Sequence, residues 1–421
     1  MSTDLAAALA PGVLDRFVRY ARIDTQARGD RTGSPSSPGQ LELGRLVAQE
    51  LVDAGLTDAA VDENGYVMAT LPANVDGGPV FGLIAHLDTS PDAPGSPVEP
   101  IVHEAYDGGR IELPRGGTVL DPQALDELAG RRGHDLVTSS GDTLLGADDK
   151  AGVAEIVTAV AHLAAHPELP RPTIRVAFTP DEEVGLGASL FDIEAFGAAF
   201  AYTLDGSSLG ELQDETFTAA AATIRIDGVD VHPGFATGQL VHAGRLAARI
   251  LTALPSDRLT PETTSGREGF IHLHEMTATA AQATLEFIVR DFDDDLLREH
   301  VELLRHTAEE VMATEPRARL TFESKAQYPN MRTHLEAFPD VVTAAEQAIR
   351  AEGIEPVRHP IRGGTDGSLL SAKGLPTPNI FAGGHEFHSV REWVSVQDMA
   401  AAAAVVVRLA GIWSAGGPTP Q

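Results

Sequence analysis

Cysteine is absent from the 421 residues of this chain. Its absence excludes disulfide bonds and thiolate metal ligands, so any metal site must use histidine, aspartate or glutamate. Positive charge is also scarce, because 31 Lys and Arg residues stand against 61 Asp and Glu residues, which gives a formal net charge of -30. Nucleic acids and anionic membranes bind to basic surfaces. We therefore expect neither of them as a partner.

The N-terminal segment, MSTDLAAALAPG, lacks the basic start and the long apolar run of a signal peptide. With no membrane span visible in the sequence either, we expect a protein of the cytoplasm. The length of 421 residues and the hydrophobic content of 43% favour a globular chain with two domains. The sequence does not determine the oligomeric state and leaves a homodimer open.

The first half of the chain alternates apolar runs with amphipathic helices. Buried strands are predicted at residues 80–85, 173–178 and 199–203. Helices are predicted at 40–54, in the segment that follows residue 150, and at 11–23, where Pro11 would be the first helical residue. This alternation is typical of an α/β domain with a mostly parallel sheet.

The pattern changes after about residue 209. The predicted order is then strand, helix, strand, strand, helix and strand, over residues 219–227, 240–254, 269–276, 282–290, 294–314 and 317–324. This order suggests a small ferredoxin-like layer. We therefore predict a three-layer α/β domain formed by residues 1–208 and 329–421, with an α+β domain inserted at 209–328.

Three apolar strands of the first half end in acidic residues or histidine. His86 and Asp88 lie at the end of the first strand, Glu182 and Glu183 follow the second, and Asp205 follows the third. In open α/β sheets, ligands bind outside the carboxyl ends of the strands. The pattern therefore predicts one shared site at this edge of the sheet.

Each of these motifs also has a structural interpretation. His86 could be an ordinary hydrogen-bonded core histidine. The adjacent carboxylates of Glu182 and Glu183 would repel each other unless a cation lay near them, but they could equally belong to a solvated acidic loop. Asp205 leaves the same choice open. The local sequence does not decide between these interpretations.

A fourth acidic motif, TLLGADDKAG, contains Asp148 in a glycine-flanked turn before a helix. Its carboxylate could bridge two cations, or it could cap the helix. Near the C-terminus, one imidazole of His385 and His388 could return over the edge of the sheet. We interpret the pair His272 and His274 as structural, because no acidic residues lie close to it in the predicted fold.

Several segments carry a resemblance to a known family. In chain order they are HLDTSPD, TLLGADDKAG, FTPDEEVG, AYTLDG, ETFTAAAATIRIDGVDVHPG, IVRDFD, IRGGTDGS and PNIFAGG with the FH that follows it. They resemble the peptidase T family of tripeptide aminopeptidases, in the same order and over nearly the whole chain. That family belongs to a wider group of dizinc exopeptidases, which includes aminoacylases and glutamate carboxypeptidases.

The resemblance implies two zinc ions per subunit, with Co2+ or Mn2+ as substitutes. It assigns His86 and Asp205 to one ion and Glu183 and His388 to the other, with Asp148 as the bridge. Each ion then has one imidazole, one carboxylate of its own and the shared carboxylate, which leaves a position for a bridging water. The resemblance also implies a cis peptide bond directly after Asp148.

Further roles follow from the same resemblance. Glu182 would be the general base, Asp88 the partner of His86, and His232 a group that stabilises the oxyanion. The domain at 209–328 would act as a lid. Substrate-binding roles are carried over to Arg290, Asn330 and Arg362.

The chain departs from the family pattern at DGSS, where the family more often has glycine after DG, and at Leu186, where arginine is frequent. Both positions bear on substrate preference. The expected function is a metalloaminopeptidase that removes the N-terminal residue from tripeptides, with small peptides as its partners. The alternatives are a dipeptidase, a carboxypeptidase, an N-acyl amino acid hydrolase, or a peptide-binding relative without catalysis.

Overall fold

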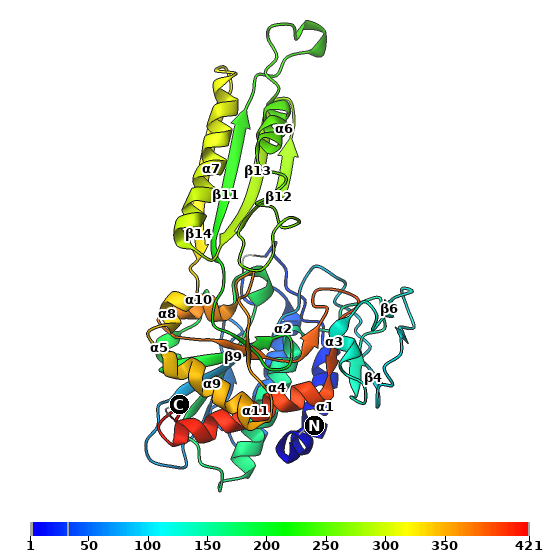
Figure 1. Ribbon diagram of the computed structural model, residues 1–421, viewed down its shortest axis with the longest axis vertical. Helices are drawn as coiled ribbons and strands as arrows, with labels where there is room; N and C mark the ends of the chain where they lie inside the picture. The colour runs from blue at the N-terminus through cyan, green and yellow to red at the C-terminus, as the bar shows by residue number, and fades with distance from the viewer. Residues whose placement is uncertain (1–2, 32, 420–421) are drawn as a thin grey trace. The chain divides into compact units, whose positions relative to one another are not determined.

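A computed structural model describes residues 3–31 and 33–419 of the chain. The chain forms two compact units (Figure 1). The larger unit comprises Met1–Asp214, His334–His359 and Thr365–Gln421, and the smaller unit comprises Glu215–Thr333 and Pro360–Gly364. The predicted fold class, an α/β domain with a second α+β domain, is confirmed.

The larger unit is built on an 8-stranded sheet. Its order is β1 (Ala60–Val61), β2 (Val67–Leu71), β8 (Ile174–Thr179), β3 (Phe81–His86), β9 (Phe200–Gly206), β16 (Asn379–Phe381), β10 (Glu211–Gln213) and β15 (Val357–Arg358). The central strands β8, β3, β9 and β16 pair in parallel, so their carboxyl ends meet at one edge. The first hairpin, β1 to β2, turns at Asn64 and Gly65, a pair that favours such turns.

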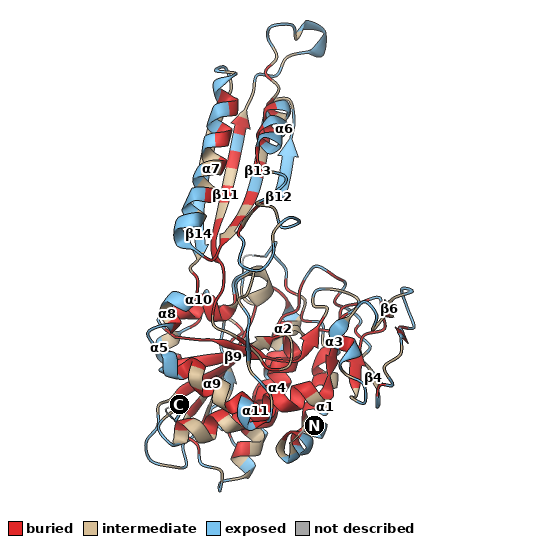
Figure 2. Ribbon diagram, viewed as in Figure 1, coloured by how far each residue is buried: buried red, intermediate tan, exposed pale blue. Residues whose placement is uncertain are grey.

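Helices cover both faces of this sheet. Alternate side chains of β3 point to opposite sides, with Leu83 in the main core and Ile84 in a smaller one. The main core is shared with α1 (Asp4–Ala21), α2 (Pro38–Asp53), α4 (Ala147–Ala165), α9 (Pro339–Ala351) and α11 (Val396–Ser414). The opposite face is covered by α5 (Ile193–Phe196) and α10 (Asp366–Ala372). Figure 2 shows α4 and α11 as largely buried elements of this three-layer unit.

Two helices of the larger unit, α11 and α1, bear on the predictions made from the sequence. Helix α11 is long and apolar enough to cross a membrane, but 78% of its most apolar window is buried inside the protein, as in a core helix. Helix α1 begins at Asp4, so the predicted start at Pro11 was wrong. The side chain of Thr3 caps α1, and the alanine-rich turns before Pro11 favour helix enough to outweigh the one hydrogen bond that a proline removes.

Short elements complete the larger unit. A 4-stranded sheet has the order β17 (Gly384–His385), β18 (Trp393–Ser395), β7 (Leu136–Thr138) and β4 (Ile101–His103). The remaining pieces are the hairpin of β5 (Ile111–Glu112) and β6 (Val119–Leu120), helix α3 (Asp126–Ala129), and the 3-10 turn η1 (Glu182–Val184). A further short helix, α8 (Arg332–Leu335), spans a boundary between the two units.

The smaller unit has the strand order β12 (Phe270–Ala278), β13 (Gln282–Asp291), β11 (Thr218–Asp227) and β14 (Arg319–Tyr328). All three pairings are antiparallel, as in a ferredoxin-like sheet. Helices α6 (Ala243–Ala253) and α7 (Asp294–Ala313) pack on one face of this sheet. Alternate residues of β11, such as Ile224 and Ile226, form the core beneath them.

The boundaries of the smaller unit follow from strand pairing. Strand β10 at Glu211–Gln213 pairs with β15 and β16, so these residues belong to the large sheet. The predicted lid domain at 209–328 and the smaller unit share residues 215–328. Residues 360–364 also return to the smaller unit, where Ile361 forms a parallel bridge with Thr216. The sequence pattern gave no indication of this second passage of the chain.

Candidate metal centre

The acidic motifs of the larger unit meet beyond the carboxyl ends of its parallel strands. His86 is the last residue of β3, and Asp205 is the second-last residue of β9, before Gly206. Asp148 lies in the turn at the start of α4, and Glu183 lies in η1, directly after β8. His388 lies in the loop that follows β17. Five residues from distant parts of the sequence are therefore brought together.

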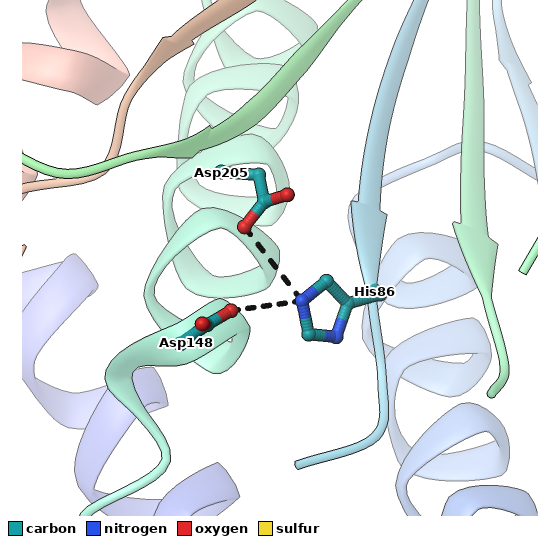
Figure 3. A group of neighbouring side chains, drawn as sticks. All are labelled: His86, Asp148 and Asp205. Carbon is teal, nitrogen blue, oxygen red and sulfur yellow. Dashed lines mark hydrogen bonds and ion pairs between the residues drawn. The ribbon is translucent and has the colours of Figure 1, made fainter. Parts of the chain in front are cut away.

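One group of candidate ligands consists of His86, Asp148 and Asp205 (Figure 3). The Nε2 atom of His86 lies 2.9 Å from Oδ1 of Asp148 and 3.7 Å from Oδ1 of Asp205. Ligand atoms around a tetrahedral zinc ion lie about 3.4 Å apart when each metal–ligand bond is about 2.1 Å. The two observed distances lie on either side of this value, so one nitrogen and two carboxylate oxygens fit a metal ion.

A second group consists of Asp148, Glu183 and His388. The Nε2 atom of His388 lies 3.2 Å from Oδ2 of Asp148 and 2.9 Å from Oε2 of Glu183. Asp148 therefore directs one carboxylate oxygen at each histidine. The other oxygen of Glu183, Oε1, is buried and has no hydrogen-bond partner among the described residues, which suits a carboxylate that binds a cation.

The sequence left two roles open for Asp148, bridging two cations or capping the helix, and the turn at the start of α4 divides these roles between Asp148 and Asp149. Gly146 adopts the left-handed conformation, with φ 81°, and Asp148 and Asp149 have non-helical backbone angles. The peptide bond between them is cis, which confirms that prediction. Asp149 does the capping, because its Oδ1 accepts the amide hydrogen of Gly152, while Asp148 faces the two histidines.

Close packing of α4 against β9 places Asp148 beside Asp205. A side chain at Gly152 would collide with the carbonyl oxygen of Leu204 in β9, so glycine is required at this point of the helix. Asp149 adds a second link, since its Oδ2 accepts the amide hydrogen of His86 at 3.2 Å. Helix α4 is thereby tied to the ends of both neighbouring strands.

Asp88 contacts two parts of the centre. Nδ1 of His86 lies 3.0 Å from the backbone carbonyl oxygen of Asp88 and 3.4 Å from its Oδ1, so both groups of Asp88 face the imidazole. The two carboxylate oxygens of Asp88 also accept the amide hydrogens of Glu182 and Glu183, at 2.9 and 3.0 Å. These residues form a 3-10 turn, and Asp88 satisfies the free amides at the start of that turn.

Crowding of carboxylates shifts the pKa values of the centre. Burial raises the pKa of Glu183 to about 8 and that of Asp205 to about 6. Burial likewise raises the pKa of Glu182. Hydrogen bonds to Asp148 and Glu183 raise the pKa of His388 to about 11. The cluster therefore retains protons that metal cations could replace.

Two histidines near the C-terminus behave differently. The ring of His385 is buried and stacks on Trp393, with 4.3 Å between ring centroids, and burial lowers its pKa to about 3. His388 instead points toward Asp148 and Glu183. Of the pair that the sequence left undecided, the structure brings only His388 into the candidate centre.

Four other predicted site residues lie in the smaller unit. Arg290 donates to the carbonyl oxygens of Ala220 and Val289, and its guanidinium group lies 5.3 Å from the ring centroid of Tyr328. Asn330, which is 4% exposed, accepts the amide hydrogens of Thr216 and Arg332.

The side chain of Arg362 donates to the carbonyl oxygens of Gly266 and Glu268 and to Oγ1 of Thr264. His232 is exposed within this unit, and its Nδ1 accepts the amide hydrogen of Gly234 at 3.1 Å. In the neutral ring, Nε2 therefore carries the hydrogen. Binding roles for Arg290, Asn330 and Arg362, and the catalytic role of His232, remain predictions.

Two contacts of the centre were not expected from the sequence. Glu392 accepts three amide hydrogens from the turn that contains Asp148. Asp92 lies 3.3 Å from Nδ1 of His388. Asp92 is the last residue of the motif HLDTSPD, so the sequence contained a signal for it. Glu392 has no such signal, because nothing around it in the sequence distinguishes it from a surface charge.

Comparison with known proteins gives consistent results. The model of the peptidase family M20/M25/M40 matches residues 143–411. Peptidase T from Bacillus velezensis is 47% identical over 403 residues, which cover 95% of this chain and 98% of that protein. A tripeptidase from Staphylococcus aureus has a similar structure, with a TM-score of 0.76 at 20% identity, over 96% of this chain and 99% of that one.

A crystal structure of aminopeptidase PepT from Bacillus cereus gives a TM-score of 0.74 at 22% identity, over 96% of this chain and 99% of that one. These two structures support the fold. The sequence relative and the family model confirm the resemblance found in the motifs. The chain therefore belongs to the peptidase family M20/M25/M40, among its peptidase T members, and is a peptidase.

Proposed function

We propose that this peptidase removes the N-terminal residue from tripeptides and acts in the cytoplasm with two zinc ions. His86 and Asp205 would hold one ion, Glu183 and His388 the other, and Asp148 would bridge them. The arrangement of Asp148 carries this proposal, because its two carboxylate oxygens face two different histidines, each with a further carboxylate beside it. The names of the similar proteins, peptidase T and tripeptidase, support the substrate class.

Glu182 is the proposed general base. It is next to the ligand Glu183, but it belongs to neither candidate ligand group, so its carboxylate is left for proton transfer. Bound zinc would supply Lewis acidity and would lower the pKa of a bound water. Glu182 would accept the proton of the attacking water and donate it to the leaving amine. Desolvation at its partly buried position raises its pKa, which favours the protonated form that must later donate to the leaving amine.

His232 is the proposed donor to the oxyanion of the tetrahedral intermediate. Such a donor must carry a hydrogen on the nitrogen that faces the substrate. The bond from Gly234 to Nδ1 leaves the hydrogen on Nε2 of the neutral ring, which suits this role.

A panel of peptides tests the proposal directly. Metal is removed with a chelator, zinc is restored, and di-, tri- and tetrapeptides are supplied with free and N-acetylated amino termini. We expect free tripeptides to lose their N-terminal residue, N-acetylated peptides to remain intact, and the chelated protein to be inactive. Mass spectrometry of the products identifies the bond that is cut.

The same panel contains the results that would contradict the proposal. Release of C-terminal residues would indicate a carboxypeptidase, and a preference for dipeptides would indicate a dipeptidase. Hydrolysis of the acetyl group would indicate an N-acyl amino acid hydrolase. Binding of peptides without any hydrolysis would indicate a peptide-binding relative.

A further inference from the structure

Glu392 is a buried carboxylate that contacts the metal centre only through the backbone. It directly precedes β18, and its side chain is almost fully buried, with 1% of the residue exposed. Its Oε2 accepts the amide hydrogens of Leu145 and Gly146, at 2.6 and 2.8 Å. Its Oε1 accepts the amide hydrogen of Asp148 at 3.0 Å. Both oxygens are thus used to bind one turn of the chain.

These three amides need an acceptor from outside the turn. Gly146 is left-handed and Asp148 has a non-helical backbone, so the amides at the start of α4 cannot use the regular helical pattern. A carboxylate that accepts several backbone amides makes strong, charge-assisted hydrogen bonds. Burial raises the pKa of Glu392 to about 7, and the three amide hydrogen bonds oppose that rise because they favour the charged form.

Because of its position in the chain, Glu392 links the segments of two candidate metal ligands, His388 and Asp148. It lies four residues after His388, and it binds the backbone of Asp148, which His388 faces at 3.2 Å. One side chain therefore connects the segment of one candidate ligand to the turn of another. A change in the direction of the Asp148 carboxylate would alter its distance to both histidines, because each oxygen faces one of them.

We propose that Glu392 is a positioning residue, which fixes the turn of Asp148 so that its carboxylate can bridge two metal ions. This inference rests on the metal pair proposed above. Glu392 itself touches neither a metal nor the substrate. Its effect passes through the backbone of Asp148, so it should act on both ions rather than on one.

Glu392→Gln tests the proposal by replacing one oxygen with an NH2 group. In either orientation of the amide, at least one backbone amide of the turn then faces a donor instead of an acceptor. Metal-free protein is titrated with Co2+, the visible absorption of the bound ions is recorded, and a competing chelator gives the two affinities. We expect both affinities to fall about 10- to 100-fold, the usual effect of losing a partner that orients a ligand, and the absorption bands to shift.

Glu386→Gln is the matched control. It makes the same chemical change in the same segment, where the carboxylate of Glu386 pairs with Arg391 instead of the turn. This variant should keep the wild-type affinities and spectrum. If Glu392→Gln fails to fold by circular dichroism, Glu392→Asp takes its place, since it keeps the charge but is one methylene too short to hold all three amides. It should also bind both ions more weakly.

Three results would overturn the inference. Wild-type affinities and spectrum in the folded Gln or Asp variant would show that the turn does not need Glu392. Weaker binding of one ion only would show that Glu392 does not act through the shared carboxylate. Wild-type protein that binds fewer than two Co2+ ions would contradict the proposed metal pair itself, and the positioning role with it.

Discussion

The predicted site residues of the two units differ in what surrounds them. In the larger unit, His86, Asp148 and Glu183 contact other predicted site residues, and Oε1 of Glu183 has no hydrogen-bond partner in residues 3–31 and 33–419. In the smaller unit, Arg290 and Arg362 direct their guanidinium groups at backbone carbonyl oxygens of their own unit. In the first set several carboxylates crowd around two imidazoles, whereas the arginines of the second set are already bonded to the backbone of their own unit.

This difference separates two kinds of polar residue that a sequence cannot distinguish. Buried carboxylates that gather without cations are costly to the fold, so they indicate a ligand that supplies positive charge. An arginine that already donates to backbone carbonyl oxygens stabilises the fold whether or not a ligand binds. His232 differs from these arginines. It is exposed within its unit, and its Nε2 is left to donate to a ligand, because Nδ1 accepts the amide hydrogen of Gly234.

The strongest test of the larger unit is Glu182→Gln. We expect it to bind two zinc ions but to lower kcat by about 100-fold or more, because the amide cannot accept the proton that a general base must take. Zinc content measured by mass spectrometry, together with steady-state kinetics on a tripeptide, checks both parts of this expectation.

Glu183→Gln is the matched control for that substitution. It makes the same change one residue away, at the carboxylate that contacts His388, and should weaken the binding of one of the two zinc ions. If Glu182→Gln instead loses half of its zinc and keeps a rate near that of the wild type, the two glutamates have been assigned the wrong way round.

His232→Ala is the corresponding test of the smaller unit. We expect kcat and kcat/KM to fall together, on the order of 100-fold, because a donor to the oxyanion acts in the transition state and not in the ground state. Zinc content and thermal stability should stay the same. His274→Ala, which removes another exposed imidazole of the same unit, should leave the kinetics unchanged. Lower stability with normal turnover in His232→Ala would mean that the histidine only shapes its turn.

Metal binding should strengthen as the pH rises. Hydrogen bonds to Asp148 and Glu183 raise the pKa of His388 to about 11, and burial raises that of Glu183 to about 8, so both hold protons at pH 7 in the metal-free protein. Metal ions bind the deprotonated groups and must displace these protons. We expect the affinity for Co2+ to increase about 10-fold per pH unit between pH 6 and 8 for each proton released.

Calorimetry in buffers of different ionisation enthalpy measures the protons released by Co2+ at each pH. Glu183→Gln should reduce that number, since one of the protonated groups is removed. An affinity that does not change between pH 6 and 8 would show that the carboxylates and His388 are already deprotonated before the metal arrives.

The edge of the sheet that carries the site could be predicted from the sequence, because each strand that forms it is marked by a short apolar run within the strand itself. Runs such as the one that ends at His86 are uniformly buried in the structure, and an apolar run bounded by polar residues is what a buried parallel strand requires. The strand predicted at 282–290 is likewise β13, whose alternate apolar side chains form the core of the smaller unit. Once the strands are assigned, the topology alone brings their terminal carboxylates to one edge.

Other features could not be predicted because their causes lie far away in the chain. Glu392 stands between an arginine and a tryptophan, and only the fold places it beside a turn 244 residues earlier. The helix start at Asp4 was missed because proline was taken as a first helical residue, although helix-favouring residues precede it. The return of residues 360–364 to the smaller unit is held by a strand bridge at Ile361 and by the bonds of Arg362 to residues 264–268, and neither contact has a signal in the local sequence.

Of the substitutions considered, Arg362→Ala should change the kinetics least. It tests whether a predicted substrate-binding residue of the smaller unit serves the fold instead. The guanidinium group of Arg362 holds Gly266 and Glu268 by their carbonyl oxygens and lies 5.2 Å from the ring centroid of Phe217. Its loss should lower the free energy of unfolding by about 1–3 kcal/mol, the usual range for breaking such a network. Thermal melting of the zinc-loaded protein measures this change.

The kinetics of the same variant decide between a structural and a substrate-binding role. If Arg362 serves the fold, kcat/KM of the folded variant should change by less than about threefold, since no interaction with the transition state is lost. Arg298→Ala is a suitable control, because Arg298 is exposed in the same unit and pairs with Asp295 on its own helix. A rise in KM at unchanged stability would instead support the substrate-binding role that the family resemblance implies. Arg362 would then have to exchange its bonds to residues 264–268 for bonds to the peptide.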